Sequence, residues 1–234
     1  MSSIRTPEPS APRAQAPLEI LYEDEDLVIV NKPSGLLVHR GLAQDADTAL
    51  FRVRDHFRQR VYPAHRLDRG TSGALLFARH PTAMSSLGKL FECGAVEKSY
   101  WALVRGRPPE SGIIDHPVPR AEGAERVPAV TRFRLLATSP RERCSLVEAL
   151  PVTGRFHQIR RHLSHIHHPL VGDVNYGRGD INRKYRAEYG FHRLGLHAHR
   201  LAFTHPLRAL NIVVEAPLDP EFARVLDELQ LSFR

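Results

Sequence analysis

The chain has 234 residues, enough for a single domain with a sizeable core, and its 42% hydrophobic content is ordinary for a globular protein. No apolar run approaches the roughly 18 residues that a membrane-spanning helix needs, and the first residues lack the apolar centre of a secretory signal, so we expect a cytoplasmic protein. The 33 Lys and Arg exceed the 26 Asp and Glu; this surplus suits a polyanionic partner such as a nucleic acid, although a solvated basic surface gives the same balance.

The N-terminal segment differs in composition from the rest of the chain. Residues 1–17 are rich in proline and alanine and show no apolar period, so we expect them to be disordered. Residues 18–234 are then one folded domain. Cys93 and Cys144 lie too far apart for a metal or redox motif, and we expect both to be reduced thiols.

Apolar runs alternate with turn signals through the folded part of the chain. They predict strands at 18–22, 27–32, 74–79, 99–106, 129–138, 144–150, 196–203 and 210–216. Helical patterns occur near 47–57, 81–92, 155–166, 180–189 and 219–230. There is no internal repeat. The order of elements predicts an α/β (α+β) fold in which a mixed, largely antiparallel sheet is flanked by helices and loops.

The segment at 65–79, HRLDRGTSGALLFAR, places one carboxylate in an unusual setting. Asp68 stands between Arg66 and Arg69, just before a run that is typical of a buried strand. A carboxylate kept ionised by guanidinium groups is a competent nucleophile or base. The alternative is structural, with Asp68 capping a turn and pairing with Arg66 or Arg69. The two glycines that follow favour the functional interpretation, because they allow a close backbone approach that a plain turn does not require.

Two enzyme classes fit this segment poorly. A hydrolase elbow needs the order Gly-x-Ser-x-Gly, whereas here the second glycine follows Ser72 directly. A glycosidase needs a second carboxylate close to Asp68. The segment itself holds none, although Asp115 or Asp173 could fold against it. Neither hydrolysis by Ser72 nor glycoside cleavage is therefore the expected activity.

The segment closely resembles the central motif of the RluA family of pseudouridine synthases, in which the aspartate is the essential catalytic residue. Three further stretches resemble motifs of the same family and occur in the same order. They are NKPSGLLVH at 31–39, EKSYWALVRG at 97–106, and GRFHQIRRHLSHIHHPLVGDVNYG at 154–177 with LHAHRLAFTHP at 196–206 after it. One motif alone could arise by chance, but four in order over most of the chain could not.

The resemblance implies a single pseudouridine synthase catalytic domain at 18–234, acting on RNA. Such an enzyme isomerises uridine by replacing the N-glycosidic bond with a carbon one, so it needs no redox cofactor and no energy source. The sequence carries no Walker, Rossmann or metal-binding signature, which agrees with an enzyme without cofactor or metal. A base cannot be reached inside its stack, so the target uridine must be flipped out.

The resemblance also implies roles for individual residues. Asp68 is the group that attacks or deprotonates the flipped nucleoside. Tyr100 matches the tyrosine that stacks on the target base, although a strand aromatic beside Trp101 could also belong to the core. Arg160, in HQIR, matches the basic residue that pairs with the catalytic aspartate, a task that suits a bidentate guanidinium. Arg66 matches the arginine that fills the gap left by the flipped base.

The helical pattern near 155–166 supports these roles from the residues alone. Ile159, Leu163 and Ile166 recur at helical spacing and predict one buried face. Thr153 is the expected N-cap, which would leave the helix N-terminus open to a phosphate. The opposite side carries the residues that could contact RNA, which are His157, Arg160, Arg161 and Ser164.

A run of histidines closes this helix and raises the question of zinc. His162, His165, His167 and His168 have no cysteine or carboxylate companion at ligand spacing, and HHP is typical of a turn. We therefore expect no metal site here.

The features around the motifs bear on the substrate. Family members that act on ribosomal RNA often carry an S4 RNA-binding domain before the catalytic one, whereas here only residues 1–17 precede the first strand. The tandem RRH at 160–162 and the insert GRGDINRKYRAEYG at 177–190 are more similar to single-domain members that modify uridine 65 in the T-arm stem of tRNA. The insert departs from their pattern, with Asp180-Ile181-Asn182 where a histidine commonly precedes the asparagine. Its Arg183 and Arg186 are expected to contact RNA.

Two alternatives stay open at this point. The nearer one is a sister synthase that acts on ribosomal RNA or on several RNAs. The other, from a different class, is a non-catalytic RNA-binding protein that kept the fold. Asp68, Tyr100 and Arg160 argue against the second, because a binding module has no need of a carboxylate close to phosphates.

Overall fold

The computed structural model describes residues 17–40 and 47–231, so the expected disorder of residues 1–17 falls almost entirely outside the described part. The strands are β1 (Glu19–Glu23), β2 (Leu27–Lys32), β3 (Tyr62–Pro63), β4 (Ser72–Ala78), β5 (Glu97–Arg105), β6 (Ser111–Asp115), β7 (Val118–Pro119), β8 (Arg126–Val127), β9 (Val130–Thr138), β10 (Cys144–Pro151), β11 (Leu196–Thr204) and β12 (Asn211–Glu215). The helices are α1 (Ala49–Phe57), α2 (Pro81–Glu92), α3 (Gln158–His165), α4 (Gly179–Tyr189) and α5 (Pro220–Glu228).

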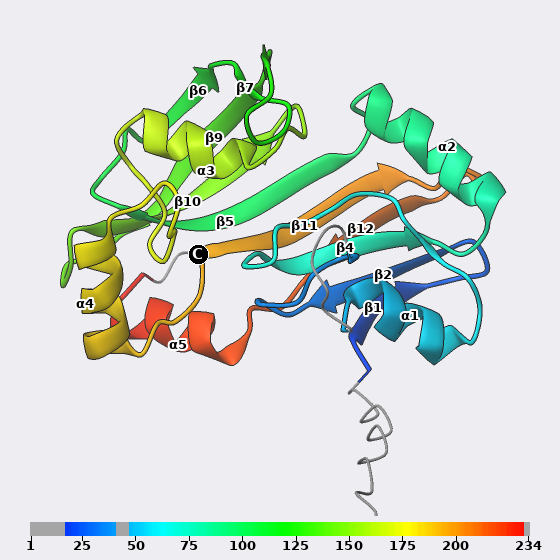
Figure 1. Cartoon of the computed structure of the whole chain (residues 1–234), viewed down its shortest axis with the longest axis horizontal. Coiled ribbons are helices and arrows are strands. Elements are labelled where there is room, and N and C mark those ends of the chain that lie inside the picture. Colours follow the sequence, from blue (N-terminus) through cyan, green and yellow to red (C-terminus); the bar gives the residue numbers. More distant parts are fainter. Residues whose placement is uncertain (1–16, 41–46, 232–234) are drawn as a thin grey trace, which may run out of the picture.

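Ten of these strands form one sheet, with the order β1-β2-β4-β11-β5-β10-β9-β6, while β12 pairs with β11 and β3 with β4. Of the pairings between described strands, only that of β4 with β11 is parallel. β7 and β8 form a separate ribbon. In Figure 1, α1 and α2 accompany the N-terminal strands, α3 lies along β9 and β10, and α4 and α5 lie together at one end. The expected mixed, largely antiparallel fold is confirmed.

The parallel pair β4–β11 joins the two halves of the sheet directly beside Asp68. Its register pairs Ser72 with His197 and Gly73 with Ala198. Gly73 has φ 109°, and a Cβ at this position would collide with the Ala198 carbonyl. Only glycine therefore fits here. The close backbone approach that the glycines predict is thus an approach of β11, and it fixes the start of β4 at the centre of the molecule.

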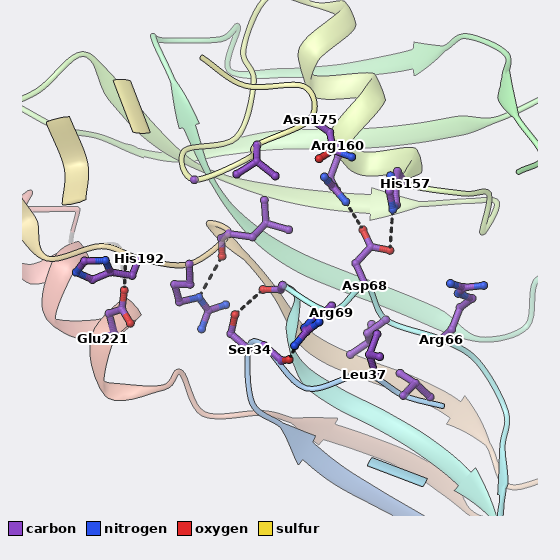
Figure 2. A pocket seen from close by; sticks show the side chains of 18 of the residues that line it. Ser34, Leu37, Arg66, Asp68, Arg69, His157, Arg160, Asn175, His192 and Glu221 are labelled. Atoms are coloured by element: carbon purple, nitrogen blue, oxygen red, sulfur yellow. Dashed lines mark hydrogen bonds and ion pairs between the residues drawn. The ribbon is translucent and has the colours of Figure 1, made fainter. Parts of the chain in front are cut away.

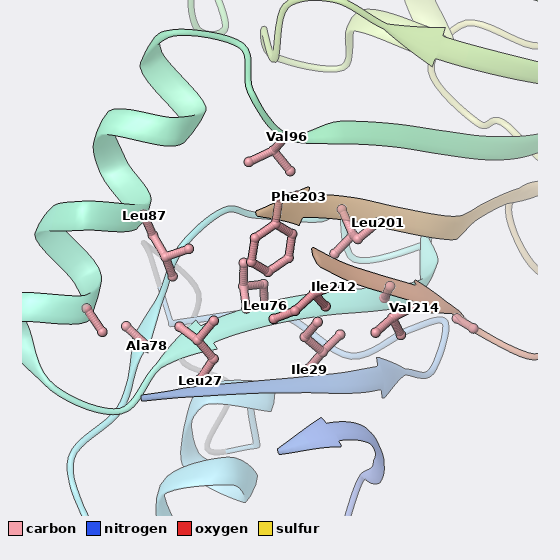
Figure 3. Packing of buried hydrophobic residues seen from close by; sticks show 13 residues of the cluster. Leu27, Ile29, Leu76, Ala78, Leu87, Val96, Leu201, Phe203, Ile212 and Val214 are labelled. Carbon is pink, nitrogen blue, oxygen red and sulfur yellow. The ribbon is translucent and has the colours of Figure 1, made fainter. Parts of the chain in front are cut away.

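The core packs on both faces of β4, which explains the unbroken apolar sequence of that strand. On one face, Leu76 packs with Leu27 of β2, Phe203 of β11 and Leu87 of α2 (Figure 3). On the other face, Phe77 belongs to the cluster that includes the buried side of α1. A strand buried this completely gives the loop before it, which carries Asp68, a rigid base.

The start of α3 differs from the sequence expectation. The N-cap is His157, in the left-handed region with φ 51°, and not Thr153. The Thr153 hydroxyl instead donates to Gln158 Oε1 at 2.6 Å and accepts from the Val130 backbone N–H at 3.2 Å. Because this hydroxyl ties the preceding loop to β9, the helix begins only at Gln158. The predicted apolar face is correct, since Leu163 is fully buried and Ile159 nearly so.

Other expectations compare as follows. The short elements β3, β6, β7 and β8 were not expected from the sequence, whereas each predicted strand and helix is present within a few residues. Cys93 is exposed and Cys144 is buried, and neither is in a disulfide. Among the described residues, no helix has the length and apolar character that crossing a membrane requires.

Candidate active site

Asp68 lies in the loop that leads into β4, and a second loop holds the backbone of this loop in place. The segment between β2 and α1 supplies that support. The Ser34 hydroxyl donates to the Gly70 carbonyl at 2.8 Å, and the Gly35 N–H donates to the Arg69 carbonyl at 2.8 Å. The Arg69 Nε returns a bond to the Gly35 carbonyl at 2.9 Å. The motif at 31–39 and the motif at 65–79 therefore form one structural unit, and this unit fixes the position of Asp68.

Lys32 completes this unit from inside the protein. It is fully buried, and its Nζ donates to the carbonyls of Pro33 at 2.9 Å, Leu36 at 2.7 Å and Arg69 at 3.3 Å. Three donors on an ammonium thus meet three acceptors. Burial, with the nearby Arg193 charge, lowers the pKa of Lys32 to about 7, against the opposing effect of Asp68. Lys32 is a buried, titratable group directly beneath the loop that carries Asp68.

Arg160 of α3 links the Asp68 carboxylate to a second, deeper carboxylate. Its NH1 donates to Asp68 Oδ2 at 3.1 Å, while its Nε and NH2 donate to the two oxygens of Asp173 at 2.8 and 2.9 Å. Burial alone would lower the pKa of Arg160, but the hydrogen bonds and charges of Asp173 and Asp68 outweigh it and raise that pKa. The guanidinium therefore stays charged, and the fork geometry with Asp173 fixes its orientation.

Asp173 is the more deeply placed of the two carboxylates. Only 1% of its surface is exposed, and its Oδ1 also accepts the backbone N–H groups of Asn175 and Tyr176. Burial acts to raise the pKa of Asp173, but the bonds and charge of Arg160, followed by those backbone donors, lower it overall. Asp173 is therefore an ionised support for Arg160. It is not a second reacting carboxylate of the kind a glycosidase requires.

His157, at the start of α3, faces the other oxygen of Asp68. Its Nε2 lies 3.7 Å from Asp68 Oδ1, and its Nδ1 lies 3.1 Å from the Tyr176 hydroxyl. The imidazole stacks on the Phe156 ring at 3.8 Å between centroids. Figure 2 shows His157 and Arg160 side by side above the carboxylate of Asp68, each facing one of its oxygens. Burial lowers the pKa of His157, and the Asp68 charge opposes this shift.

A cavity of about 660 Å³ opens in front of Asp68 (Figure 2). Its acidic lining residues are Asp68 and Glu221, and its basic ones are His39, Arg66, Arg69, His157, Arg160, His192 and Arg193. The excess of basic groups suits a polyanion, and the volume is that of a ligand-sized site. Four residues that the sequence singles out, Asp68, Arg66, His157 and Arg160, therefore line one cavity.

Tyr100 lies on β5, in the part of the sheet next to Asp68. It pairs with Ala198 of β11 and is half-buried between two of the hydrophobic clusters. Burial, together with the Asp68 charge, raises the pKa of Tyr100, so the phenol keeps its proton. Trp101 points to the opposite face of the sheet and stacks on His199 at 3.8 Å. The two aromatic side chains thus lie on opposite faces of the sheet, and Tyr100 is the one beside Asp68.

The remaining predicted residues lie at three different places. Arg66 is exposed at the mouth of the cavity. Arg161 is half-buried, with its guanidinium 4.8 Å from the Tyr176 ring centroid, and it does not line the cavity. Arg183 and Arg186 are exposed on α4, away from the cavity lining. The structure therefore brings Arg66 and His157 to the same cavity as Asp68 and Arg160, whereas Arg161, Arg183 and Arg186 lie outside its lining.

Ser72 has no access to a substrate. It is fully buried, where its hydroxyl accepts from Arg193 NH2 at 2.7 Å and lies 2.7 Å from His197 Nδ1. The His197 Nε2 in turn lies 3.0 Å from the Ala216 carbonyl, which fixes the tautomer so that Nδ1 accepts from Ser72. This buried chain of polar groups joins β4 to β11 and excludes the hydrolase interpretation.

The histidines at 162–168 contact protein groups outside the run, and His165 stacks on the His116 ring at 3.8 Å. His162 lies between Thr131 Oγ1 and the His116 carbonyl, and His168 bonds to the Arg105 carbonyl. Among the described residues, the cluster with metal-ligand geometry is elsewhere, at Asp24, Asp26 and His205. Its two carboxylates already accept bonds from Tyr22, His80, Arg208 and backbone N–H groups. This cluster links the β1–β2 turn to the β11–β12 turn.

Three residues that support the Asp68 site were not predicted from the sequence. Asp173 was considered only as a possible second carboxylate, and Lys32 and Tyr176 were not singled out. A lysine at the end of the apolar run LVIVNK is a detectable signal, because an isolated charge in a buried strand needs partners. The link from Asp173 to Arg160 has no such local sign, since it depends on a turn after α3 that the periodicity does not predict.

Comparison with known proteins identifies the class of enzyme to which this fold and site belong. A family model described as RNA pseudouridylate synthase matches residues 26–165, a span that includes Asp68, Tyr100 and Arg160. The chain belongs to this family and is an isomerase of the pseudouridine synthase class.

Curated relatives resemble the chain over nearly its whole length. Proteins named tRNA pseudouridine synthase C are 37% identical in Vibrio parahaemolyticus (93% of this chain, 97% of the relative) and 41% identical in Pasteurella multocida (90% and 95%). The solved structure of human RNA Pseudouridylate Synthase Domain Containing 4 is similar to the present fold, with a TM-score of 0.75 and 26% identity, covering 92% of this chain and 94% of that one.

Proposed function

We propose that this enzyme converts a uridine of transfer RNA to pseudouridine, at position 65 in the T-arm stem, and that it works in the cytoplasm. The observation that carries the proposal is the Asp68 carboxylate, held by Arg160 in a cavity lined mainly by basic groups. Curated relatives named tRNA pseudouridine synthase C, similar over at least 90% of this chain, support tRNA as the substrate class.

Asp68 is the reacting group in this proposal. The N1–C1′ bond of the nucleoside breaks and a C5–C1′ bond forms, while a proton leaves C5 and the released N1 gains one, so the atoms balance without a cofactor. Arg160 holds Asp68 Oδ2, which directs Oδ1 to the substrate. The carboxylate initiates the exchange by attack on the base or the sugar, or by removing a proton.

The other site residues act on binding and position. Tyr100, a half-buried neutral phenol beside Asp68, stacks on the flipped base. Arg66, exposed at the cavity mouth, enters the duplex where the base has left. Arg161 holds Tyr176 through its guanidinium and contacts RNA with its exposed part. Arg183 and Arg186 on α4 contact the folded RNA at a distance from the reacting base.

The test compares three RNAs with purified enzyme: a full-length tRNA transcript, its isolated T-arm hairpin, and short ribosomal stem-loops. We expect pseudouridine at position 65 of the full-length tRNA, less in the hairpin, and loss of the same modification in cells that lack the protein. Faster conversion of a ribosomal stem-loop than of any tRNA would make the enzyme a sister synthase. Binding of tRNA without any conversion would indicate a non-catalytic RNA-binding protein.

A further inference from the structure

The two oxygens of the Asp68 carboxylate have different environments. Oδ2 accepts a hydrogen bond from Arg160 NH1 at 3.1 Å, and Arg160 is itself locked by Asp173. The His157 Nε2 is 3.7 Å from Oδ1, which is longer than a hydrogen bond. One oxygen is therefore permanently bound, while the other faces a group that can change its charge.

Several contacts hold His157 in this position. Its backbone is in the left-handed region, with φ 51° and ψ 30°, which costs a residue with a Cβ about 1 kcal/mol or more. Its ring lies against Phe156 and beside Tyr176, and only 15% of the side chain is exposed. Strain that persists at one residue beside a reacting carboxylate points to a function for that residue.

The neighbours of His157 favour one tautomer of its neutral ring. The Asp68 carboxylate in front of Nε2 can only accept, which favours a hydrogen on Nε2, and Nδ1 then accepts from the Tyr176 hydroxyl at 3.1 Å. The neutral imidazole then carries its hydrogen on Nε2, the atom that faces Asp68. If the ring gains a second proton, the hydroxyl can rotate and accept from Nδ1.

We propose that His157 is a positioning residue that controls the free oxygen of Asp68. The neutral ring orders Oδ1 but leaves its lone pairs available to the nucleoside. The protonated ring is attracted to Oδ1, so that both carboxylate oxygens are bound by cations and the reaction stops. This inference rests on the pseudouridine synthase activity and gives His157 a role in chemistry rather than the RNA contact that the sequence suggests.

The charges around His157 determine the pH range in which its protonation controls Asp68. Asp68 from the loop before β4 and Asp173 from the loop after α3 favour the protonated ring, while Arg160 and Arg161 from α3 oppose it, and Tyr176 is neutral. Burial is the largest influence, and together these lower the pKa of His157 below its ordinary value of 6.5. The ring is thus neutral at pH 7 and above and becomes charged on the acid side.

The test is the pH dependence of single-turnover rates with saturating RNA, measured for the wild type, His157→Gln and His157→Asn. Glutamine keeps a polar N–H group without titrating, and asparagine tolerates the left-handed backbone best. We expect the wild-type rate to fall up to about tenfold per pH unit below the pKa of His157. Both variants should have a several-fold lower plateau and no such fall. His56→Gln, a matched change at an exposed histidine of α1 outside the cavity lining, should keep the wild-type profile.

Two results would overturn the inference. One is that the single-turnover rates of both His157 variants still fall at acid pH as the wild-type rate does, with their folding checked by thermal unfolding. The other is weaker RNA binding and a smaller salt dependence with an unchanged single-turnover rate, which would make His157 a phosphate contact. Failure of the proposed substrate is a separate outcome: if tRNA is not converted, the same profile is measured on the RNA that is.

Discussion

The loop that carries Asp68 and the helix α4 are both basic regions that follow family-like patterns, but they are built differently. The Asp68 loop is held by bonds from Lys32, Ser34 and Arg160, residues that lie far from it in the sequence. The arginines of α4 are exposed, and Arg178 at its N-terminus pairs with its near neighbour Asp180. Long-range contacts thus fix the carboxylate of Asp68, whereas the charges of α4 lie on an exposed surface helix and pair locally.

The ion pairs of the two regions also differ in how much they contribute to stability. The Arg160–Asp173 pair is buried, and a buried pair that loses one partner leaves an uncompensated charge. The Arg178–Asp180 pair is open to solvent, where screening leaves it little influence on stability. Changes to the buried residues that hold Asp68 in place should therefore affect both folding and rate, while changes on α4 should affect RNA choice alone.

The largest effect is expected at Asp68 itself. Asp68→Asn keeps the shape of the side chain but removes the reacting charge, so we expect the rate of pseudouridine formation to fall by roughly 10⁴-fold. RNA affinity and thermal stability should stay near those of the wild type. The measurement is single-turnover conversion together with RNA binding. Near-normal turnover of Asp68→Asn would contradict the catalytic assignment, and a joint loss of binding and folding would favour a turn cap.

The next largest effect is expected at Asp173. Asp173→Asn leaves the buried Arg160 without its fork partner, and such a loss costs about 3 kcal/mol of the free energy of unfolding. The freed guanidinium should then bind both oxygens of Asp68 and lower the rate as well. Denaturant unfolding and single-turnover rates measure the two effects. Asp115→Asn, at an exposed position on β6, is the matched control and should change neither.

Lys32 provides a test that depends on pH. Its pKa is about 7 in the folded protein against 10.5 for an ordinary lysine, so between these values the unfolded chain binds one more proton. The free energy of unfolding should therefore rise with pH through this window, by up to about 1.4 kcal/mol per unit, and this contribution is lost as the pH falls to 7. Lys32→Met should remove this dependence of the free energy of unfolding on pH, whatever the substitution costs in overall stability.

The control for this experiment is Lys89→Met, at an exposed lysine on α2, which should keep the wild-type slope. An equal slope in Lys32→Met and the wild type would mean that the ammonium stays protonated throughout. Its three carbonyl partners would then dominate over burial, and Lys32 would be a permanent cation beneath the Asp68 loop.

The same contrast explains what the sequence could predict. β4 and α3 follow from local apolar patterns, and each is present close to its predicted range. The prediction that Thr153 is the N-cap of α3 was wrong because Thr153 bonds to Val130 of β9, a contact that no local pattern reveals. The strands β7 and β8 were missed because each has only two residues, and β6 was missed because prolines lie close to it on both sides.

The site shows the same limit. The pairing of Asp68 with Arg160 was predicted by resemblance, and the structure contains it although it spans 92 positions of the chain. The residues that support this pair, Asp173 and Lys32, act through contacts that form only when the loops meet. Resemblance predicts the reacting group and its arginine partner, but Asp173 and Lys32 had to be found in the fold.

The smallest effect, and the one that most sharpens the comparison, is expected on α4. Arg183 and Arg186 lie outside the cavity, so replacing both with glutamine should leave conversion of an isolated T-arm hairpin unchanged. Conversion of full-length tRNA should fall a few-fold, because two phosphate contacts are lost, and the salt dependence of binding should weaken. The measurement is the ratio of kcat/KM for the two RNAs.

The control is the double change Arg132→Gln with Arg134→Gln, at exposed positions of β9, which removes the same charge and should keep the ratio. If both pairs of changes lower the ratio equally, net charge attracts the tRNA and α4 has no specific part in choosing it.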